Sequence, residues 1–233
     1  MGKKFVVRLT EQELAKLLAT QILDKELKKI LGKEVPKTDD SKSTTTGSSP
    51  IKTDGSSSGE FPTLDLSTQE GYNAYKEIAD KFINSRSANL LNIKGSMLAD
   101  AAKNTQSKTG TYVPVELALA QLAAEGGFSK NPNARPIRTK NPFNVGNVDS
   151  GKNVFHGSVQ SGIQTYYDLM ARRYLAGGKS ASDLIRNFVN VNGNRYASSQ
   201  NYERDVAKIA SQVKSMGDPV YASITRDFKT GNV

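Results

Sequence analysis

The chain has no cysteine, no tryptophan and a single histidine, His156, among its 233 residues. The absence of cysteine excludes disulfides, thiol nucleophiles and cysteine-ligated zinc. One histidine argues against a Ser-His-Asp hydrolase and excludes a site with several histidine ligands. We therefore expect no metal and no cofactor, and we assign His156 no chemical role. Carboxylate chemistry is the route to bond cleavage that these absences leave open.

Long apolar runs are also missing. None approaches the ~20 residues that a membrane-spanning helix needs. The basic start, Met1–Arg8, has too short an apolar stretch for a secretory signal, so we expect no signal peptide. The net charge of +9 favours an anionic polymer as partner, either cell-wall glycan or nucleic acid. No nucleic-acid motif accompanies the scattered Lys and Arg, which disfavours nucleic acid.

Composition divides the chain into three parts. Residues 1–35 predict an amphipathic helix that begins at a capping box, Thr10–Glu13, and is too small to form its own core. Its apolar face would dock onto a larger assembly, onto the rest of this chain or onto a second copy. Residues 36–60, rich in Ser, Thr and Gly, predict a disordered linker. Residues 61–233 predict the folded domain.

Helical periodicity dominates residues 61–233, with a capping box at Ser67–Glu70 and later apolar stripes at helical spacing. Aromatic residues at such spacing usually belong to the core, so we interpret Tyr166, Tyr167 and Tyr174 as core. Residues 144–155 predict a short β-hairpin. The fold class expected is α+β, mostly helical with a small hairpin.

One segment carries the strongest chemical signal, namely Val113–Phe128. It predicts a helix that is apolar almost all round, opened by Pro114 and stopped by Gly126 and Gly127. Glu125 would lie on its last turn, where desolvation and the negative end of the helix dipole raise the pKa of a carboxyl. A carboxylic acid that stays protonated near neutral pH is what a glycosidase uses as its general acid. The alternative is a solvated Glu beside a Gly-Gly cap.

Four blocks in order resemble the glucosaminidase family of peptidoglycan hydrolases, which has a lysozyme-like fold. These are Val113–Phe128, Asn141–Gly146, Phe155–Ile163 and Arg195–Tyr202, and the similarity extends from about Glu70 to Val213. The resemblance implies cleavage of the β-1,4 glycan strand of peptidoglycan on the reducing side of N-acetylglucosamine. The site residues that it implies are Glu125 as general acid, Tyr196 near the scissile bond, and Gln121, Asn141 and Phe143 in contact with substrate.

The chain departs from the family pattern at several positions. Gly-Gly-Phe follows Glu125, Asn144 stands where the family has glycine, and Gln200-Asn201 replaces Asp-Pro. Asp149 is the one hairpin candidate for a second catalytic acid, although Val148–Gly151 also fits an ordinary turn. A muramidase or a lytic transglycosylase is the near alternative. A non-catalytic virion or cell-wall-binding protein with the same fold is the more distant one.

Two basic segments suggest partners. The opening of residues 1–35 resembles the short N-terminal segment of virion-associated phage proteins. This likeness implies docking on a phage particle, and a location on the virion or at the host cell wall or periplasm. Lys130–Lys140 is the densest basic stretch near Glu125, and we expect either a solvated loop or one that guides an anionic substrate.

Overall fold

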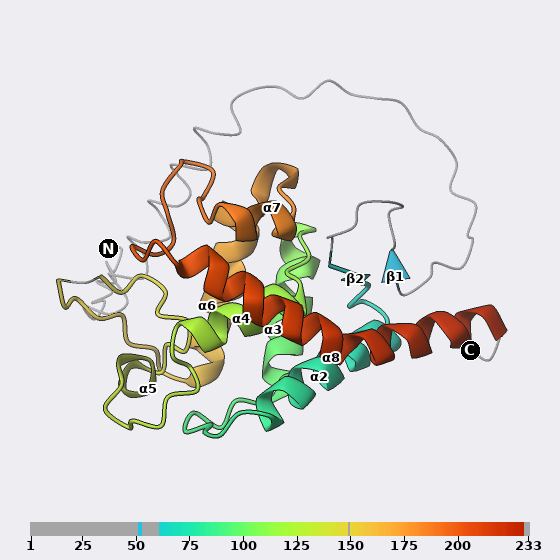
Figure 1. The fold of residues 1–233 in the computed structure, drawn as a ribbon, viewed down its shortest axis with the longest axis horizontal. Coiled ribbons are helices and arrows are strands. Elements are labelled where there is room, and N and C mark those ends of the chain that lie inside the picture. The colour runs from blue at the N-terminus through green and yellow to red at the C-terminus, as the bar shows by residue number, and fades with distance from the viewer. Residues whose placement is uncertain (1–50, 53–60, 149, 231–233) are drawn as a thin grey trace, which may run out of the picture. The chain divides into compact units, whose positions relative to one another are not determined.

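The computed structural model describes residues 51–52, 61–148 and 150–230 (Figure 1). The chain divides into two units, residues 1–46 and 47–233, and all described residues belong to the second. The predicted docking helix over residues 1–35, most of the predicted linker and Asp149 lie outside the described residues.

The described part is mostly helical, as the periodicity predicts. Its helices, in chain order, are α2 (Gln69–Asn84), α3 (Gly95–Thr109), α4 (Val115–Ala124), α5 (Arg135–Thr139), α6 (Val159–Leu169), the π-helix η1 (Met170–Tyr174), the 3₁₀-helix η2 (Ala176–Gly178), α7 (Ala181–Arg186) and α8 (Tyr202–Thr230). None of them is long and apolar enough to cross a membrane.

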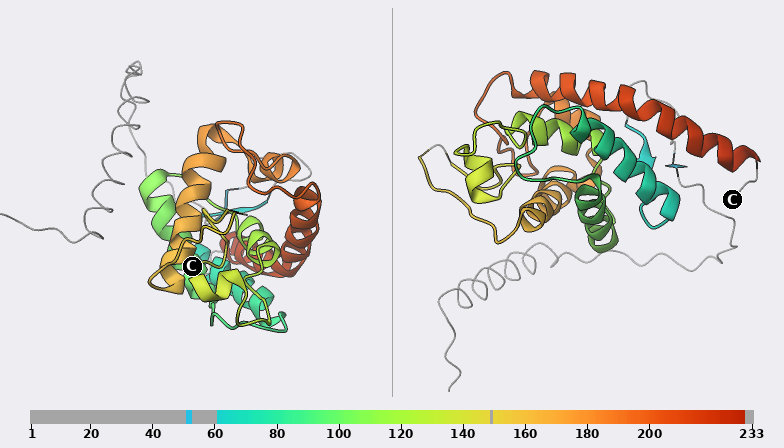
Figure 2. Two further views of the ribbon diagram at one scale, coloured as in Figure 1. Left: turned by 90° about the vertical axis from the view of Figure 1, so that its left-hand side faces the viewer. Right: turned by 90° about the horizontal axis from the view of Figure 1, so that it is seen from below.

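Helix α4 lies at the centre of this unit. Every side chain from Val115 to Leu122 is buried, which is the expected state of a helix that is apolar all round. It packs against α8 and α2, and the long α8 runs over both helices in the right-hand view of Figure 2. The two partners thus exclude water from most of its surface, and the less buried residues lie at its C-terminal end, Ala123–Glu125.

Helices α2, α3 and α6 complete the core. Helix α2 packs on α3, and α3 on α6. The cap of α2 differs by one residue from the prediction: Thr68, not Ser67, accepts a hydrogen bond from the Gly71 N–H, while the Ser67 hydroxyl donates to Asp65. The Thr68 side chain thus satisfies one of the N–H groups of the first turn that have no partner within the helix.

The predicted core tyrosines are confirmed. Tyr166 and Tyr167 are fully buried and Tyr174 is 5% exposed. The Tyr167 hydroxyl hydrogen-bonds with that of Tyr75 at 2.7 Å, so these polar ends are satisfied inside the core. The ring of Phe143 stacks on Tyr166 with 3.7 Å between centroids.

The predicted hairpin over residues 144–155 is wrong, since the described residues of this segment form turns and no strand. Asparagine side chains take the backbone partners that a ladder would need. Asn141 bonds both the N–H and the carbonyl of Val145, and the Asn147 carbonyl oxygen accepts from the Val154 N–H. Side chains of this kind compete with regular strands for backbone groups.

The strands of the described part lie elsewhere. β1 (Ile51–Lys52) pairs antiparallel with β2 (Thr63–Leu64), and β1 falls inside the stretch that composition marks as linker. A single antiparallel bridge joins Val189 and Arg195. The α+β prediction therefore reduces to a mostly helical fold.

Candidate functional site

Helix α4 ends in a glycine cap that presents Glu125. Gly126 has φ of 81°, and its N–H donates to the Ala123 carbonyl, while the Gly127 N–H donates to that of Leu122. This is the Schellman arrangement, in which a left-handed residue closes the helix. A Cβ on Gly127 would lie 2.9 Å from the Leu122 carbonyl oxygen. Both glycines are therefore required to turn the chain sharply after Glu125.

An open cleft of about 590 Å³ lies at this end of α4. Three segments far apart in the sequence form its walls: the end of α4, the loop Asn144–Val148 and the segment Tyr196–Tyr202. Leu169, just before the π-helical turn η1, and Tyr174, its last residue, complete it together with Arg135 of α5. Irregular helical turns of this type often occur at functional sites.

The pKa of the Glu125 carboxyl is raised above its ordinary value because burial disfavours the charged form. Hydrogen bonds from Tyr202 and Asn144 lower it but do not cancel the effect of burial. The predicted direction is confirmed, and desolvation, one of the two predicted causes, is the largest contribution. Glu125 is thus a carboxyl that keeps its proton more readily than an exposed one, with donors ready for the charge that forms when the proton leaves.

A buried chain of hydrogen bonds fixes the orientation of Tyr202. The Tyr166 hydroxyl donates to Oε1 of Gln121 at 2.6 Å, which leaves the amide Nε2 to donate to the Tyr202 oxygen at 2.9 Å. Because the Tyr202 oxygen already accepts, its single proton is free to donate to Glu125, with which it hydrogen-bonds. Gln121 therefore acts on the carboxyl through Tyr202.

Asn144 supplies the second donor. Its Nδ2 donates to the Glu125 carbonyl at 2.8 Å and to Oε2 at 3.3 Å, while its Oδ1 accepts from Asn147 at 2.9 Å. The backbone of Asn144 has φ of 51°, a conformation that asparagine tolerates better than most residues. Asn144, one of the positions that depart from the family pattern, thus has a left-handed backbone and supplies a donor to the carboxyl.

Tyr196 lies on the wall of the cleft, but its hydroxyl proton is already used. The hydroxyl donates to the Phe143 carbonyl at 2.8 Å, and the ring stacks on Tyr202 with 5.7 Å between centroids. Tyr196 therefore joins the loop after α5 to the segment before α8. The geometry makes it a positioning residue for the cleft wall.

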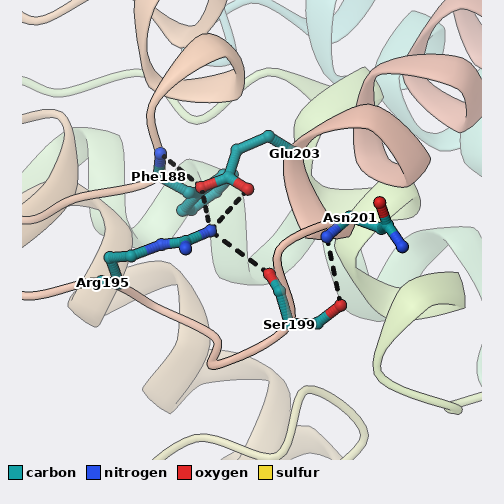
Figure 3. Close-up of polar contacts among 5 residues, drawn as sticks. All are labelled: Phe188, Arg195, Ser199, Asn201 and Glu203. Carbon is teal, nitrogen blue, oxygen red and sulfur yellow. Dashed lines mark hydrogen bonds and ion pairs between the residues drawn. The ribbon is translucent and has the colours of Figure 1, made fainter.

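A polar cluster holds the segment that carries Tyr196 and Tyr202 (Figure 3). Nη2 of Arg195 lies 2.7 Å from both carboxyl oxygens of Glu203 and donates to the Ser199 carbonyl, and the Phe188 N–H donates to Glu203. Burial alone would raise the pKa of Glu203, but these hydrogen bonds, with one from its own backbone, hold it below its ordinary value. The carboxylate therefore stays charged. Its ion pair with Arg195 ties together the two residues that flank the segment, Arg195 before it and Glu203 after it.

Three of the predicted substrate-contact residues lie behind the cleft instead of on its walls. Gln121, Asn141 and Phe143 are fully buried, so they cannot touch a ligand. Asn141 and Phe143 shape the loop that presents Asn144, and Gln121 orients Tyr202. The resemblance placed these residue types near the site, but it could not tell which side of the wall each one faces.

Glu125 is the only carboxylate among the described residues that line the cleft. Asp149, the candidate second acid, lies outside the described residues, although its neighbour Val148 is on the cleft wall. The described residues also contain no cluster of three or more His, Asp or Glu that would hold a metal ion. The donors Asn144 and Tyr202 were not predicted, since only the folded chain brings them to Glu125.

Comparison with known proteins adds no identification. No protein-family model matches the chain, and neither the curated proteins nor the solved structures contain a significant match.

Proposed function

We propose that the chain cleaves the β-1,4 glycan strand of peptidoglycan as an N-acetylglucosaminidase, with Glu125 as general acid. The observation that carries this proposal is a carboxyl of raised pKa on the wall of an open cleft, with two uncharged donors aimed at it. The order of the four sequence blocks supports the choice of substrate, and the net charge of +9 suits an anionic wall polymer.

In the proposed reaction, the Glu125 proton passes to the glycosidic oxygen as the bond to the anomeric carbon breaks. The resulting carboxylate accepts hydrogen bonds from Tyr202 and Asn144, which stabilise its charge. It then takes a proton from the attacking water, which restores the acid. General acid catalysis of this kind contributes about 10²–10⁴-fold to the rate.

Positive charge develops at the anomeric carbon as the glycosidic bond breaks, and a second group is needed to stabilise it. Glu125 is the only carboxylate among the described residues of the cleft, so the candidates for this group are the substrate's own acetamido oxygen and Asp149, which lies outside the described residues. The same observation also favours a second function, a lytic transglycosylase, in which the muramic acid 6-hydroxyl attacks and forms an anhydro end. One carboxyl suffices there as acid and then as base.

Mass spectrometry of the products from purified cell wall tests both proposals. We expect new reducing ends on N-acetylglucosamine, and none in the Glu125→Gln variant, which keeps the shape of the side chain but has no acidic proton. Anhydro-muramic ends would replace the first proposal with the second. Full activity of the Glu125→Gln variant would contradict both, and binding without cleavage by the unaltered chain would favour the non-catalytic wall-binding protein.

A further inference from the structure

Arg135 differs from Arg138 and Lys140, the two cations that follow it. Nε of Arg138 donates to the Asn133 carbonyl at 3.0 Å, and Nζ of Lys140 donates to the Gly157 carbonyl at 3.2 Å. The Arg135 side chain has no such partner among the described residues, and it lines the cleft. Of the two explanations for this basic segment, solvated loop or substrate contact, the geometry favours substrate contact for Arg135 alone.

The backbone that carries Arg135 is fixed next to the catalytic carboxyl. Pro136 is buried, and a Cβ built on Gly126 would lie 3.8 Å from its Cγ, so α5 packs against the cap that presents Glu125. The Thr139 hydroxyl donates to the Arg135 carbonyl at 2.7 Å, and the Asn141 N–H donates to that of Pro136. The guanidinium therefore extends from a rigid support.

The charges along the cleft are sparse. Glu125 is the only carboxyl and Arg135 the only basic side chain among the described lining residues. The two groups that lower the pKa of Glu125, Tyr202 and Asn144, are both uncharged, and no described acid pairs with Arg135. The guanidinium thus remains available to a ligand. Its planar fork of donors is suited to a carboxylate.

We propose that Arg135 binds a carboxylate on the lactyl-peptide branch of muramic acid, beside the bond that Glu125 protonates. This inference rests on the proposed function and specifies its substrate. Peptidoglycan and chitin share the β-1,4 N-acetylhexosamine backbone, and the anionic branch is what distinguishes them. The carboxylate can belong to the stem peptide or, where the peptide has been removed, to the lactyl group.

Calorimetric binding to the full chain in a Glu125→Gln background, which prevents turnover, tests the inference. The probes are chitohexaose, a peptidoglycan tetrasaccharide with its stem peptides, and the same tetrasaccharide after an amidase has exposed the lactyl carboxylate. Arg135→Gln should weaken binding of the carboxylate-bearing fragments by about tenfold, the loss expected for one charge-assisted contact, and leave chitohexaose unchanged. Arg138→Gln, the matched control, should change none of the three.

The pattern of losses separates the possible results. A loss confined to the peptide-bearing fragment assigns the stem carboxylate, and a loss confined to the amidase-treated fragment assigns the lactyl carboxylate. A loss with both fragments shows that Arg135 accepts either carboxylate. If Arg135→Gln leaves the affinity of the Glu125→Gln chain for every probe unchanged, the inference is overturned. It is also overturned if the Glu125→Gln chain binds neither muramic acid fragment. A chain that binds as expected but cleaves no wall glycan would contradict the proposed function while the subsite stands.

Discussion

Helix α4 carries a glutamate at each end, and the two make an instructive pair. Glu116 is fully buried, accepts a hydrogen bond from the Tyr221 hydroxyl at 2.7 Å, and has no partner for Oε2. Glu125 accepts from Tyr202 in the same way but faces the cleft. Burial raises the pKa of both carboxyls, and that of Glu116 reaches about 7.

The difference between them is access. A raised pKa marks a carboxyl that holds its proton, but only a group that touches a cleft can pass that proton to a substrate. Glu116 is fully buried and hydrogen-bonded to Tyr221 of α8, so its proton contributes to stability. Glu125 combines the same chemistry with an open wall and with Asn144 as an additional donor.

The largest effect expected from this comparison, beyond the loss of Glu125 itself, concerns stability at Glu116. Its folded pKa of about 7 exceeds the ordinary 4.5, so its contribution is full below about 4.5 and is lost as pH rises through about 7. Glu116→Gln should remove this dependence, which amounts to roughly 2–3 kcal/mol between pH 4.5 and 8. Urea unfolding at several pH values measures it.

The same variant provides the control for function. Glu116→Gln should clear cell wall at a rate within about twofold of the unaltered chain, since the residue has no access to substrate. A Glu116→Gln variant that folds normally but no longer clears cell wall would contradict the purely structural role that we assign to Glu116.

A smaller effect is expected at Tyr196. Tyr196→Phe leaves the part-buried Phe143 carbonyl without its donor, at a cost of about 1–2 kcal/mol. Because the hydroxyl holds the wall and donates to no substrate, stability and turnover should fall together. Thermal melting and turnover, measured on the same preparation, test this. A large loss of turnover at an unchanged melting temperature would contradict the positioning role and indicate that the Tyr196 hydroxyl contacts the sugar directly.

Local patterns in the sequence predict much of this fold. The apolar run before Gly126 gives α4 and the position of Glu125, and the spacing of Tyr166 and Tyr167 gives their burial, because each depends on neighbours within a few residues. The hairpin over residues 144–155 fails for the opposite reason. Which backbone groups the asparagine side chains take is decided only when Asn141, Val145 and Val154 are brought together.

The candidate site depends even more on distant contacts. Gln121 and Tyr202 are 81 positions apart, and Glu116 and Tyr221 are 105 apart. No local sequence pattern predicts that the two residues of such a pair form a hydrogen bond. The family-like blocks place Gln121, Asn141 and Phe143 in the right region but on the wrong side of the wall. Residue type alone does not distinguish a contact with substrate from the support behind it.

The pH dependence of kcat/KM for wall hydrolysis, measured for the unaltered chain and for Tyr202→Phe, tests the central claim most directly. Activity should fall on the alkaline side as Glu125 loses its proton, with an apparent pKa above the ordinary 4.5. Tyr202 donates to the charged carboxylate and so lowers its pKa. Removing that hydroxyl should therefore move the alkaline limb to higher pH. A limb that stays in place, or moves to lower pH, would contradict Glu125 as the proton donor.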